Sequence, residues 1–364
     1  MVDQNFLKVR KFSISIFLFL ISINFSFAEN LNFEKIVDLN DPWGSTFISS
    51  NELLITEKSG KIKLINLNSK QVSEVNHDLN YLEHGQGGLL DIIYKDNFIY
   101  ISYTENRGNW KTSTSIAKAK FNKKNLIFEN IFQANPPIDS GYHFGSRLVI
   151  KDNYLYATAG ERNEGMIAQD PTKHPGSIIR IKTNGKIPTD NPKFTGKKEW
   201  LPEIYAIGVR NPQGITVSPH NNKIYFSNHG PRGGDHIAQL KSGANYGWKD
   251  IAWGGTKYSG FSIGKVPFKK KYDKPIKTWV PSIAISSIQF YNGDVFLEWK
   301  GDLIVCSLSG KSLIRLDYEN NKILDEEIIF KNKIGRIRDF KVDKEGNIFL
   351  INDRKNAELW KLTR

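Results

Sequence analysis

The sequence predicts an all-β chain folded as a six-bladed β-propeller of four-stranded antiparallel sheets. A short apolar strand pattern recurs six times, hairpin signals follow some of the copies, and helical periodicity is hard to find beyond the N-terminal segment. Most copies follow a turn-like Asn or Gly. The copies are residues 53–56, 99–102, 155–158, 224–227, 303–306 and 348–351.

The spacing of the copies is typical of propeller blades. Successive copies start 46, 56, 69, 79 and 45 residues apart, and a repeat near 40–50 residues with several strands per unit indicates a blade. The longer intervals predict inserted loops, mainly between residues 160 and 300. Second strands at 61–65 and 312–316 follow Ser-Gly turns and predict hairpins. A pair of β-sandwiches is the alternative that this pattern leaves open.

The N-terminal segment has the features of a cleaved signal peptide. Three basic residues, Lys8, Arg10 and Lys11, precede an apolar run at 12–23. Small residues at 26 and 28 then occupy the positions that signal peptidase inspects. The run is shorter than the roughly 20 apolar residues that span a bilayer. We therefore expect a signal peptide at 1–28 and a single catalytic propeller at 29–364. The mature chain would then be periplasmic or secreted, without stable membrane insertion.

Composition narrows the class of ligand. The formal net charge is +13, and the basic residues look scattered, without a recognised nucleic-acid motif. Nucleic-acid binding is therefore disfavoured, whereas an anionic small molecule suits a basic protein. Cys306 is the only cysteine, so no internal disulfide can form and the fold must be held by burial.

Six motifs carry a family resemblance over nearly the whole mature chain. Their order resembles that of the soluble aldose sugar dehydrogenases that depend on pyrroloquinoline quinone (PQQ), the glucose/sorbosone dehydrogenase family. The motifs are HGQGGLLD at 84–91, HFGSRL at 143–148, RNPQG at 210–214, HGPRGGD at 229–235, NYGW at 245–248 and RIRD at 336–339.

The resemblance implies catalytic roles for three residues. His143 would be the base that takes the hydroxyl proton of an aldose while hydride leaves for PQQ, and neutral histidine suits this step near pH 7. Glu161, at the end of the next strand, would orient the imidazole. Arg210 would stabilise the negative charge that develops on the quinone.

The resemblance also implies a set of cofactor contacts. Gln86, Arg210, Asn211 and Tyr258 match positions that contact PQQ in the family. Arg336 and Arg338 are two residues apart, which puts both guanidinium groups on one face of a strand. Paired guanidinium groups suit the carboxylates of PQQ.

Calcium is the second cofactor that the resemblance implies. The backbone carbonyls of Gly230 and Pro231 would hold a catalytic ion, since calcium prefers oxygen ligands. The family has a second, structural calcium at Tyr246 and at a glutamate, but this chain has His236 in place of the glutamate. Because nitrogen is a poor calcium ligand, we expect the second site to be weak or missing.

One further departure concerns a cofactor-contacting lysine. Ser309 stands where the family often has this lysine, and Lys311 reaches the same face only if the chain stays extended. The substrate class is an aldose, with specificity expected from the loop at 251–280, and the electron acceptor is unidentified. The alternatives are a calcium-dependent propeller hydrolase or lactonase and a non-catalytic binding propeller.

Overall fold

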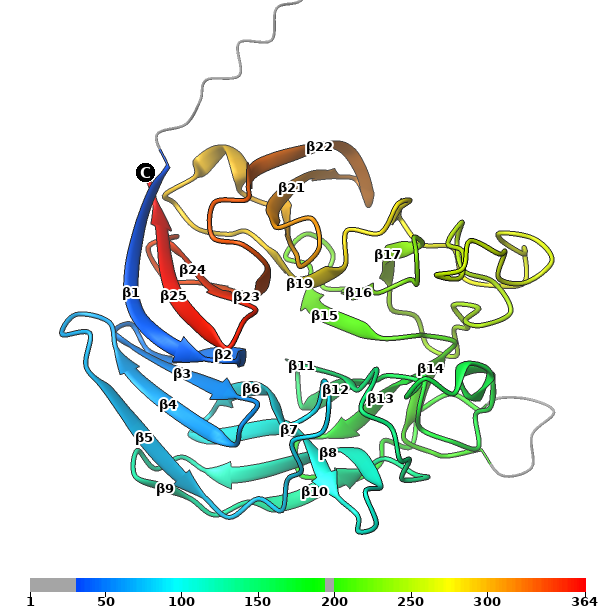
Figure 1. Cartoon of the computed structure of the whole chain (residues 1–364), viewed down its shortest axis with the longest axis horizontal. Coiled ribbons are helices and arrows are strands. Elements are labelled where there is room, and N and C mark those ends of the chain that lie inside the picture. The colour runs from blue at the N-terminus through cyan, green and yellow to red at the C-terminus, as the bar shows by residue number, and fades with distance from the viewer. Residues whose placement is uncertain (1–30, 194–199) are drawn as a thin grey trace, which may run out of the picture. The chain divides into compact units, whose positions relative to one another are not determined.

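The computed structural model describes residues 31–193 and 200–364, which form six antiparallel sheets arranged around a centre (Figure 1). The predicted six-bladed propeller is confirmed. Residues Leu31–Arg364 make one compact unit, and the predicted signal peptide at 1–28 lies outside the described residues. None of the helices in the described residues is long and apolar enough to cross a membrane.

Each sheet contains four strands in a fixed order from the centre outward. The first strands are β2 (Pro42–Ser49), β6 (Leu89–Lys95), β11 (Gly145–Lys151), β15 (Pro212–Val217), β19 (Ile285–Phe290) and β23 (Ile337–Val342). The second strands are β3 (Glu52–Glu57), β7 (Phe98–Asn106), β12 (Tyr154–Ala159), β16 (Ile224–Asn228), β20 (Leu303–Ser307) and β24 (Ile348–Asn352).

The outer strands complete the sheets. The third strands are β4 (Lys61–Asn66), β8 (Thr112–Lys120), β13 (Ser177–Lys182), β17 (Asp235–Gln239), β21 (Ser312–Glu319) and β25 (Asn356–Thr363). The fourth are β5 (Val72–His77), β10 (Glu129–Gln133), β14 (Ile204–Ile207), β18 (Lys277–Trp279), β22 (Lys322–Lys331) and β1 (Asn32–Asn40). The first sheet gains a fifth strand, β9 (Asn125–Leu126), which pairs with β5 in parallel. Within residues 31–193 and 200–364 the helical elements are 3₁₀ turns, η1 (Gly165–Gln169) and η2 (Leu297–Trp299).

All six predicted repeats lie in the second strands. These strands read as continuous apolar runs because sheets of neighbouring blades cover both of their faces. In β16, β20 and β24 every residue is buried. The core consequently lies between blades, as where Leu54 of β3 packs with Ile99 and Ile101 of β7.

The N-terminal strand closes the ring, which the repeat pattern did not reveal. β1 forms the outer strand of the last sheet and pairs with β25 from Asn32 opposite Thr363 to Asn40 opposite Asn356. Val37 and Leu39 of β1 are buried against Leu359 of β25. The two ends of the described chain are thereby tied into one blade.

Every first strand contains a β-bulge near its start. In each case the register with the second strand shifts by one residue, and a bulge of this kind redirects side chains locally. The bulged positions are 43–44 in β2, 90–91 in β6, 146–147 in β11, 213 in β15, 286–287 in β19 and 338 in β23. Six strands therefore turn side chains toward one place at the same end of the ring.

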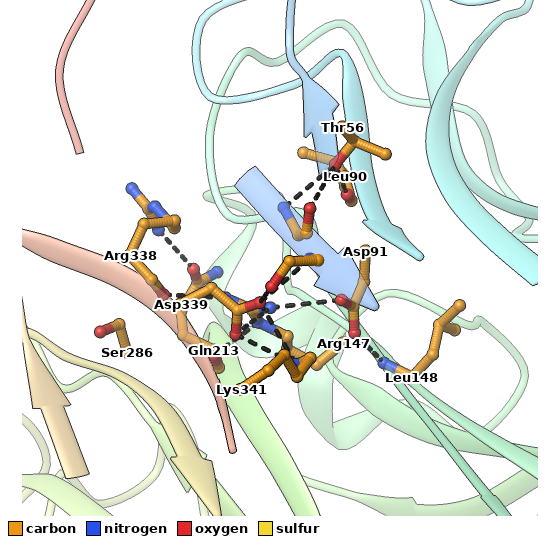
Figure 2. Close-up of polar contacts among 12 residues, drawn as sticks. Thr56, Leu90, Asp91, Arg147, Leu148, Gln213, Ser286, Arg338, Asp339 and Lys341 are labelled. Carbon is orange, nitrogen blue, oxygen red and sulfur yellow. Dashed lines mark hydrogen bonds and ion pairs between the residues drawn. The ribbon is translucent and has the colours of Figure 1, made fainter. Parts of the chain in front are cut away.

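The guanidinium of Arg147 lies at the centre of these bulges (Figure 2). Its Nη1 is 3.0 Å from Asp339 Oδ1 and 3.3 Å from Asp91 Oδ1. Its Nε donates to the carbonyl of Gln213 at 2.9 Å, and its Nη2 donates to the carbonyl of Arg338 at 2.9 Å. One buried side chain thus joins the first strands of four blades.

Further contacts satisfy the two carboxylates. Asp91 Oδ2 accepts the backbone N–H of Leu148 at 2.8 Å, and Asp339 Oδ2 accepts the Ser45 hydroxyl at 2.8 Å. Lys341 Nζ lies 3.2 Å from Asp339. The Arg147 guanidinium also packs over the Trp43 ring at 4.1 Å. The network therefore connects β2 to the same centre and leaves both buried carboxylates with partners.

Replacing Arg147 by alanine is expected to destabilise the fold strongly. The change leaves the buried Asp91 and Asp339 without their shared cation, and breaking a buried ion pair from one side costs about 3–5 kcal/mol. Urea unfolding followed by circular dichroism measures the loss. The control is Lys35→Ala, which removes an exposed pair with Asp38 and should cost less than about 1 kcal/mol. Equal losses for the two variants would contradict the network's importance.

Candidate active site

A pocket of about 480 Å³ opens where the six first strands begin. All six blades contribute to its wall at or next to their first strands, through Trp43, Leu90, Gly145, Gln213, Ala284 and Arg338. The bulges described above therefore shape this pocket. Its lining is strongly basic, with five lysines or arginines against two aspartates, a net of +3 (5 − 2) when histidine is neutral. The charged residues are Lys58, Arg336, Arg338, Arg354, Lys355, Asp41 and Asp353.

His143 and Glu161 form a buried pair beside this pocket. His143 lies two residues before β11 with a positive φ of 51°, and its backbone N–H donates to Gln86 Oε1 at 2.9 Å. Its Nδ1 hydrogen-bonds to Glu161, which follows β12. Glu161 also accepts the backbone N–H of Gly165. The predicted contact between His143 and Glu161 is present. The imidazole and the backbone N–H of Gly165 together hold the carboxylate in place.

The surroundings of His143 favour a neutral imidazole. Burial lowers the pKa of His143 below its ordinary value of 6.5. The hydrogen bond that the ring donates to Glu161 raises this pKa, and the nearby cation of Arg210 lowers it. The net direction is downward. Since Glu161 fixes the proton on Nδ1, the free lone pair of the neutral ring lies on Nε2.

Arg210 and Asn211 are held in place by their backbones. Both N–H groups donate to Asn228 Oδ1, at 3.1 and 2.9 Å, and both side chains are buried. Arg210 Nη1 donates to the carbonyl of Gly230 at 3.2 Å. Asn211 Oδ1 accepts the backbone N–H of Gly145 at 3.0 Å. Desolvation by burial lowers the pKa of Arg210, but a guanidinium remains charged near neutral pH.

Arg336 and Arg338 bind the same carboxylate. Arg336 Nη2 is 2.7 Å from Asp353 Oδ2, and Arg338 Nη2 is 2.6 Å from Asp353 Oδ1. Burial opposes ionisation of Asp353, but Arg338 and Arg336 hold the pKa of its carboxyl well below its usual range. Arg338 Nη1 also donates to Gln213 Oε1 at 2.8 Å. The two guanidinium groups therefore reach one carboxylate, although Arg336 precedes β23 and residue 338 lies in a bulge, and together they exceed the charge of Asp353 by one.

The glycine-rich turn places Gln86 against the pocket. A Cβ on Gly88 would lie 2.1 Å from the carbonyl oxygen of Lys58, and one on Gly85 would lie 2.4 Å from that of Gly141. Both positions have positive φ, so glycine is needed on two counts. The glycines thus bring protein backbones together, whereas Gly85 and Gln86 line the pocket.

Sequence and structure comparisons place this arrangement in a known family. The family model for glucose/sorbosone dehydrogenase matches residues 39–361. The chain belongs to the glucose/sorbosone dehydrogenase family.

Three relatives illustrate the family's relation to this chain. Aldose sugar dehydrogenase YliI of Escherichia coli strain K12 is 33% identical over 92% of this chain and 93% of its own length. Quinoprotein glucose dehydrogenase B of Acinetobacter calcoaceticus is 26% identical, over 90% of this chain and 86% of its own. The crystal structure of the soluble E. coli aldose sugar dehydrogenase in its apo-form superposes with a TM-score of 0.87 at 32% identity, covering 92% and 99% of the two chains.

The carbonyls that the family resemblance assigns to a catalytic calcium lie in a tight turn. Gly230 donates its N–H to Asp235 Oδ1 at 2.8 Å, and the Gly230 carbonyl faces Arg210. Pro231 is buried. Asp235 Oδ2 accepts from Ser282 at 2.8 Å, so this carboxylate supports the loop. Among the described residues, no group of three or more His, Cys, Asp or Glu side chains is arranged to hold a metal.

The residues at which the resemblance implies a structural calcium already form hydrogen bonds within the protein. His236 is buried, its Nδ1 lies 2.9 Å from the Gly234 carbonyl, and burial lowers its pKa to about 4. The Tyr246 hydroxyl donates to the Gln239 carbonyl at 2.6 Å, and the Tyr246 carbonyl accepts from Trp253 Nε1 at 2.9 Å. Both Tyr246 oxygens therefore already have protein partners.

The remaining predicted contacts lie at the edge of the pocket or outside it. Tyr258 is 73% exposed, although its hydroxyl is among the groups that affect the pKa of Arg210. Ser309 and Lys311 are exposed and do not line the pocket, whereas Leu308 does. Lys58, from the first blade, is a lining cation that the family-based reading did not anticipate.

Sequence reasoning missed several residues of this site. Asp353 and His229 line the pocket, and His229 Nε2 is buried without a hydrogen-bond partner. Burial, Arg210 and Arg338 lower the pKa of His229 to about 3, so its ring is neutral at physiological pH. Asp353 follows β24 much as Glu161 follows β12. The rule that selected Glu161, a carboxylate after a second strand, would have found Asp353 as well.

The His143 ring is expected to stay neutral at pH values where a free histidine is half protonated. Its folded pKa is depressed, so protonation should begin only below the ordinary value of 6.5. Glu161→Gln should depress the pKa further, because it removes the carboxylate that favours the imidazolium. Nitrogen chemical shifts of the ring measured by NMR against pH test both statements. A pKa above 6.5, or an upward shift in Glu161→Gln, would contradict them.

Proposed function

We propose that this protein is a PQQ- and calcium-dependent oxidoreductase that oxidises an aldose at C1 to the lactone, with His143 as the base. The observation that carries the proposal is the buried His143–Glu161 pair beside the buried cation of Arg210. Membership of the glucose/sorbosone dehydrogenase family and the two curated dehydrogenase relatives support the same chemistry.

The pocket fits PQQ in charge and in donor chemistry. PQQ is a tricarboxylate, and the lining carries a net charge of +3. Arg336 and Arg338 share one carboxylate of the chain, which leaves donor capacity for an anionic ligand. The buried and unpartnered His229 Nε2 is a polar atom that a ligand would satisfy. When bound, PQQ supplies the acceptor for the hydride that leaves the sugar.

His143 would accept the proton of the anomeric hydroxyl on Nε2. Glu161 holds the Nδ1 proton, which fixes the tautomer and stabilises the imidazolium that forms. Loss of one proton to His143 and one hydride from C1 converts the C–OH group into the carbonyl of the lactone. The base thereby carries one of the two hydrogens, and the other leaves with both electrons.

Arg210 and a bound calcium would stabilise the negative charge that develops during this transfer. The Arg210 guanidinium is buried and held toward Gly230, whose carbonyl with that of Pro231 would hold the ion. Calcium would act there as a Lewis acid. Gln86 positions the His143 backbone, while Asn211 anchors Gly145. Tyr258 would extend the site through its loop.

The basic pocket favours a dehydrogenase over the two alternatives. A calcium-dependent hydrolase or lactonase has no use for the paired cations of Arg336 and Arg338. A non-catalytic binding propeller does not require the buried contact between His143 and Glu161. With the signal peptide at 1–28, the enzyme would act in the periplasm or outside the cell, on a small-molecule aldose and with a separate electron acceptor.

His143→Gln is expected to lower kcat by about 10²–10⁴-fold while cofactor binding is kept. This is the usual effect of losing a positioned base. Steady-state turnover of the PQQ- and calcium-loaded protein with glucose measures kcat, and the cofactor's absorbance measures binding. Unchanged turnover would remove His143 from the mechanism.

The matched comparison is Arg338→Ala. Its guanidinium would pair with a carboxylate of PQQ that stays unchanged during the reaction. Its loss should therefore weaken PQQ binding more than it lowers kcat at saturating cofactor. Asp353 keeps Arg336 as a partner in this variant. If both variants showed the same pattern of kcat and cofactor affinity, the division between base and cofactor anchor would be wrong.

Metal analysis of the PQQ-loaded protein is expected to find about one calcium per chain. His236 is a buried nitrogen donor, and both Tyr246 oxygens have protein partners, so a second ion lacks hard ligands. His236→Glu should add a second calcium and raise Tm only when calcium is present. Two tightly held ions in the wild-type chain, one beside Tyr246, would contradict this prediction.

A further inference from the structure

One loop carries almost half of the chain's net positive charge, on lysines that the proposed chemistry does not use. Residues 249–277, here called the lysine loop, contain eight lysines and two aspartates, a net charge of +6 (8 − 2) out of +13 for the whole chain. The lysines are Lys249, Lys257, Lys265, Lys269, Lys270, Lys271, Lys274 and Lys277. The loop joins β17 to β18 in the fourth blade and extends away from the ring (Figure 1).

Five of these eight lysines have no carboxylate partner among the described residues. Lys269 and Lys271 share Asp250, and Lys277 pairs with Glu326 of β22. The second aspartate of the loop, Asp273, is taken by Lys241, from outside the loop. Five exposed lysines of the loop therefore form no ion pair with any described residue. They are Lys249, Lys257, Lys265, Lys270 and Lys274.

An apolar groove lies among these cations. The groove has a volume of about 1090 Å³, and its lining includes Trp253, Phe268, Tyr272, Lys270 and Lys274. Phe268 is 65% exposed. Phe261 and Val266 of the same loop are also exposed. Exposed apolar side chains surrounded by one sign of charge are typical of a protein-binding surface with an apolar centre and a polar rim.

The base of the lysine loop is anchored beside the turn that carries Gly230. The backbone N–H of Arg232 donates to the carbonyl of Thr256 at 3.1 Å, and Trp253 Nε1 donates to the carbonyl of Tyr246 at 2.9 Å. Tyr258 affects the pKa of Arg210. The loop is therefore connected to the candidate site through Tyr258 and through the turn that carries Gly230.

We propose that the lysine loop is the docking surface for an acidic electron-accepting protein. This inference rests on the proposed function, because sugar oxidation releases two electrons that must leave the cofactor. The chain has a single cysteine, too few for an iron–sulfur cluster or a disulfide relay of its own. One aldose gives one lactone, two protons and two electrons, and two molecules of a one-electron haem acceptor take the electrons singly.

Charge and shape favour an acidic protein over a membrane surface. Five unpaired ammonium groups would steer a partner of opposite charge and raise its association rate. The apolar groove is concave, and a protruding side chain of a protein can fill it, whereas a bilayer surface is flat. Electron-transfer encounters also use small interfaces, below about 1,200 Å² of total buried area, which one loop can supply.

The test uses cytochrome c and succinylated cytochrome c as a matched pair of acceptors. Succinylation replaces lysine ammonium groups with carboxylates and keeps the haem, so the two probes differ mainly in charge. The full mature protein, loaded with PQQ and calcium, is given glucose at low ionic strength. We expect the succinylated form to be reduced at least about tenfold faster, with a rate that falls as NaCl is added.

The variant Lys265→Glu/Lys270→Glu/Lys274→Glu should lower the rate with succinylated cytochrome c by at least about tenfold. Its turnover with the small dye 2,6-dichlorophenolindophenol should stay within about twofold of wild type, because a small dye does not need a protein docking surface. Calorimetric binding of succinylated cytochrome c to the apo-protein should weaken in parallel.

The control variant is Lys95→Glu/Lys120→Glu/Lys322→Glu, which makes the same change in net charge. These exposed lysines lie at strand ends or hairpin turns away from the pocket, and the rate with succinylated cytochrome c should change less than about twofold.

Three outcomes would overturn the proposal. Equal effects of the two triple variants would show that only net charge matters. A lysine-loop variant that keeps its cytochrome rate but no longer sediments with phosphatidylglycerol vesicles would make the loop a membrane-binding surface. Absence of dye reduction by the loaded wild-type protein with every aldose of a broad panel would instead contradict the proposed function, and the docking role would fall with it.

Discussion

The buried guanidinium of Arg147 is the contact on which the arrangement of the inner strands depends. It lies between Asp91 and Asp339, donates to the carbonyls of Gln213 and Arg338, and is deeply buried. An uncompensated charge at this depth would be very unfavourable, so the four first strands must converge for the group to be satisfied. The strand ladders run within blades, apart from the short pair of β5 with β9, and this network adds buried polar contacts to the apolar core between blades.

The same contact connects the fold to the pocket. Arg147 holds the backbone of Arg338, whose side chain reaches Asp353 and Gln213. Gln213 in turn donates to Asn211 Oδ1 at 3.1 Å. Since each bulge turns one or two side chains out of the regular alternation, the first strands carry both the central network and the pocket wall. The cations for an anionic cofactor are therefore positioned by buried structure and not by flexible side chains alone.

The second strands and the site motifs were readable from the sequence because each leaves a local signal. A strand covered on both faces is a continuous apolar run, and β24 shows it at residues 348–351. The pairing of His143 with Glu161 followed from a resemblance and from the position of a carboxylate after a strand. Strand alternation predicts a shared side for Arg336 and Arg338, but Arg336 precedes β23 and residue 338 lies in a bulge, so both reach Asp353 through this local geometry.

Other features left no such signal. The closure by β1 pairs residues more than 300 positions apart, and the bulges depend on register between strands, which one sequence does not encode locally. Asp353 was overlooked although its position resembles that of Glu161. The expectation that the basic residues are scattered was wrong for the lysine loop, where +6 of the charge lies in 29 residues. Net charge alone does not reveal such clustering.

The most direct test of the account is a titration of the apo-protein with PQQ in the presence of calcium, followed by the addition of single aldoses. The absorbance of the cofactor reports both binding and reduction. The account predicts saturable binding near one PQQ per chain and loss of the oxidised spectrum when an oxidisable aldose is added. Failure to bind PQQ with calcium present, or binding without reduction by any aldose of a broad panel, would contradict it.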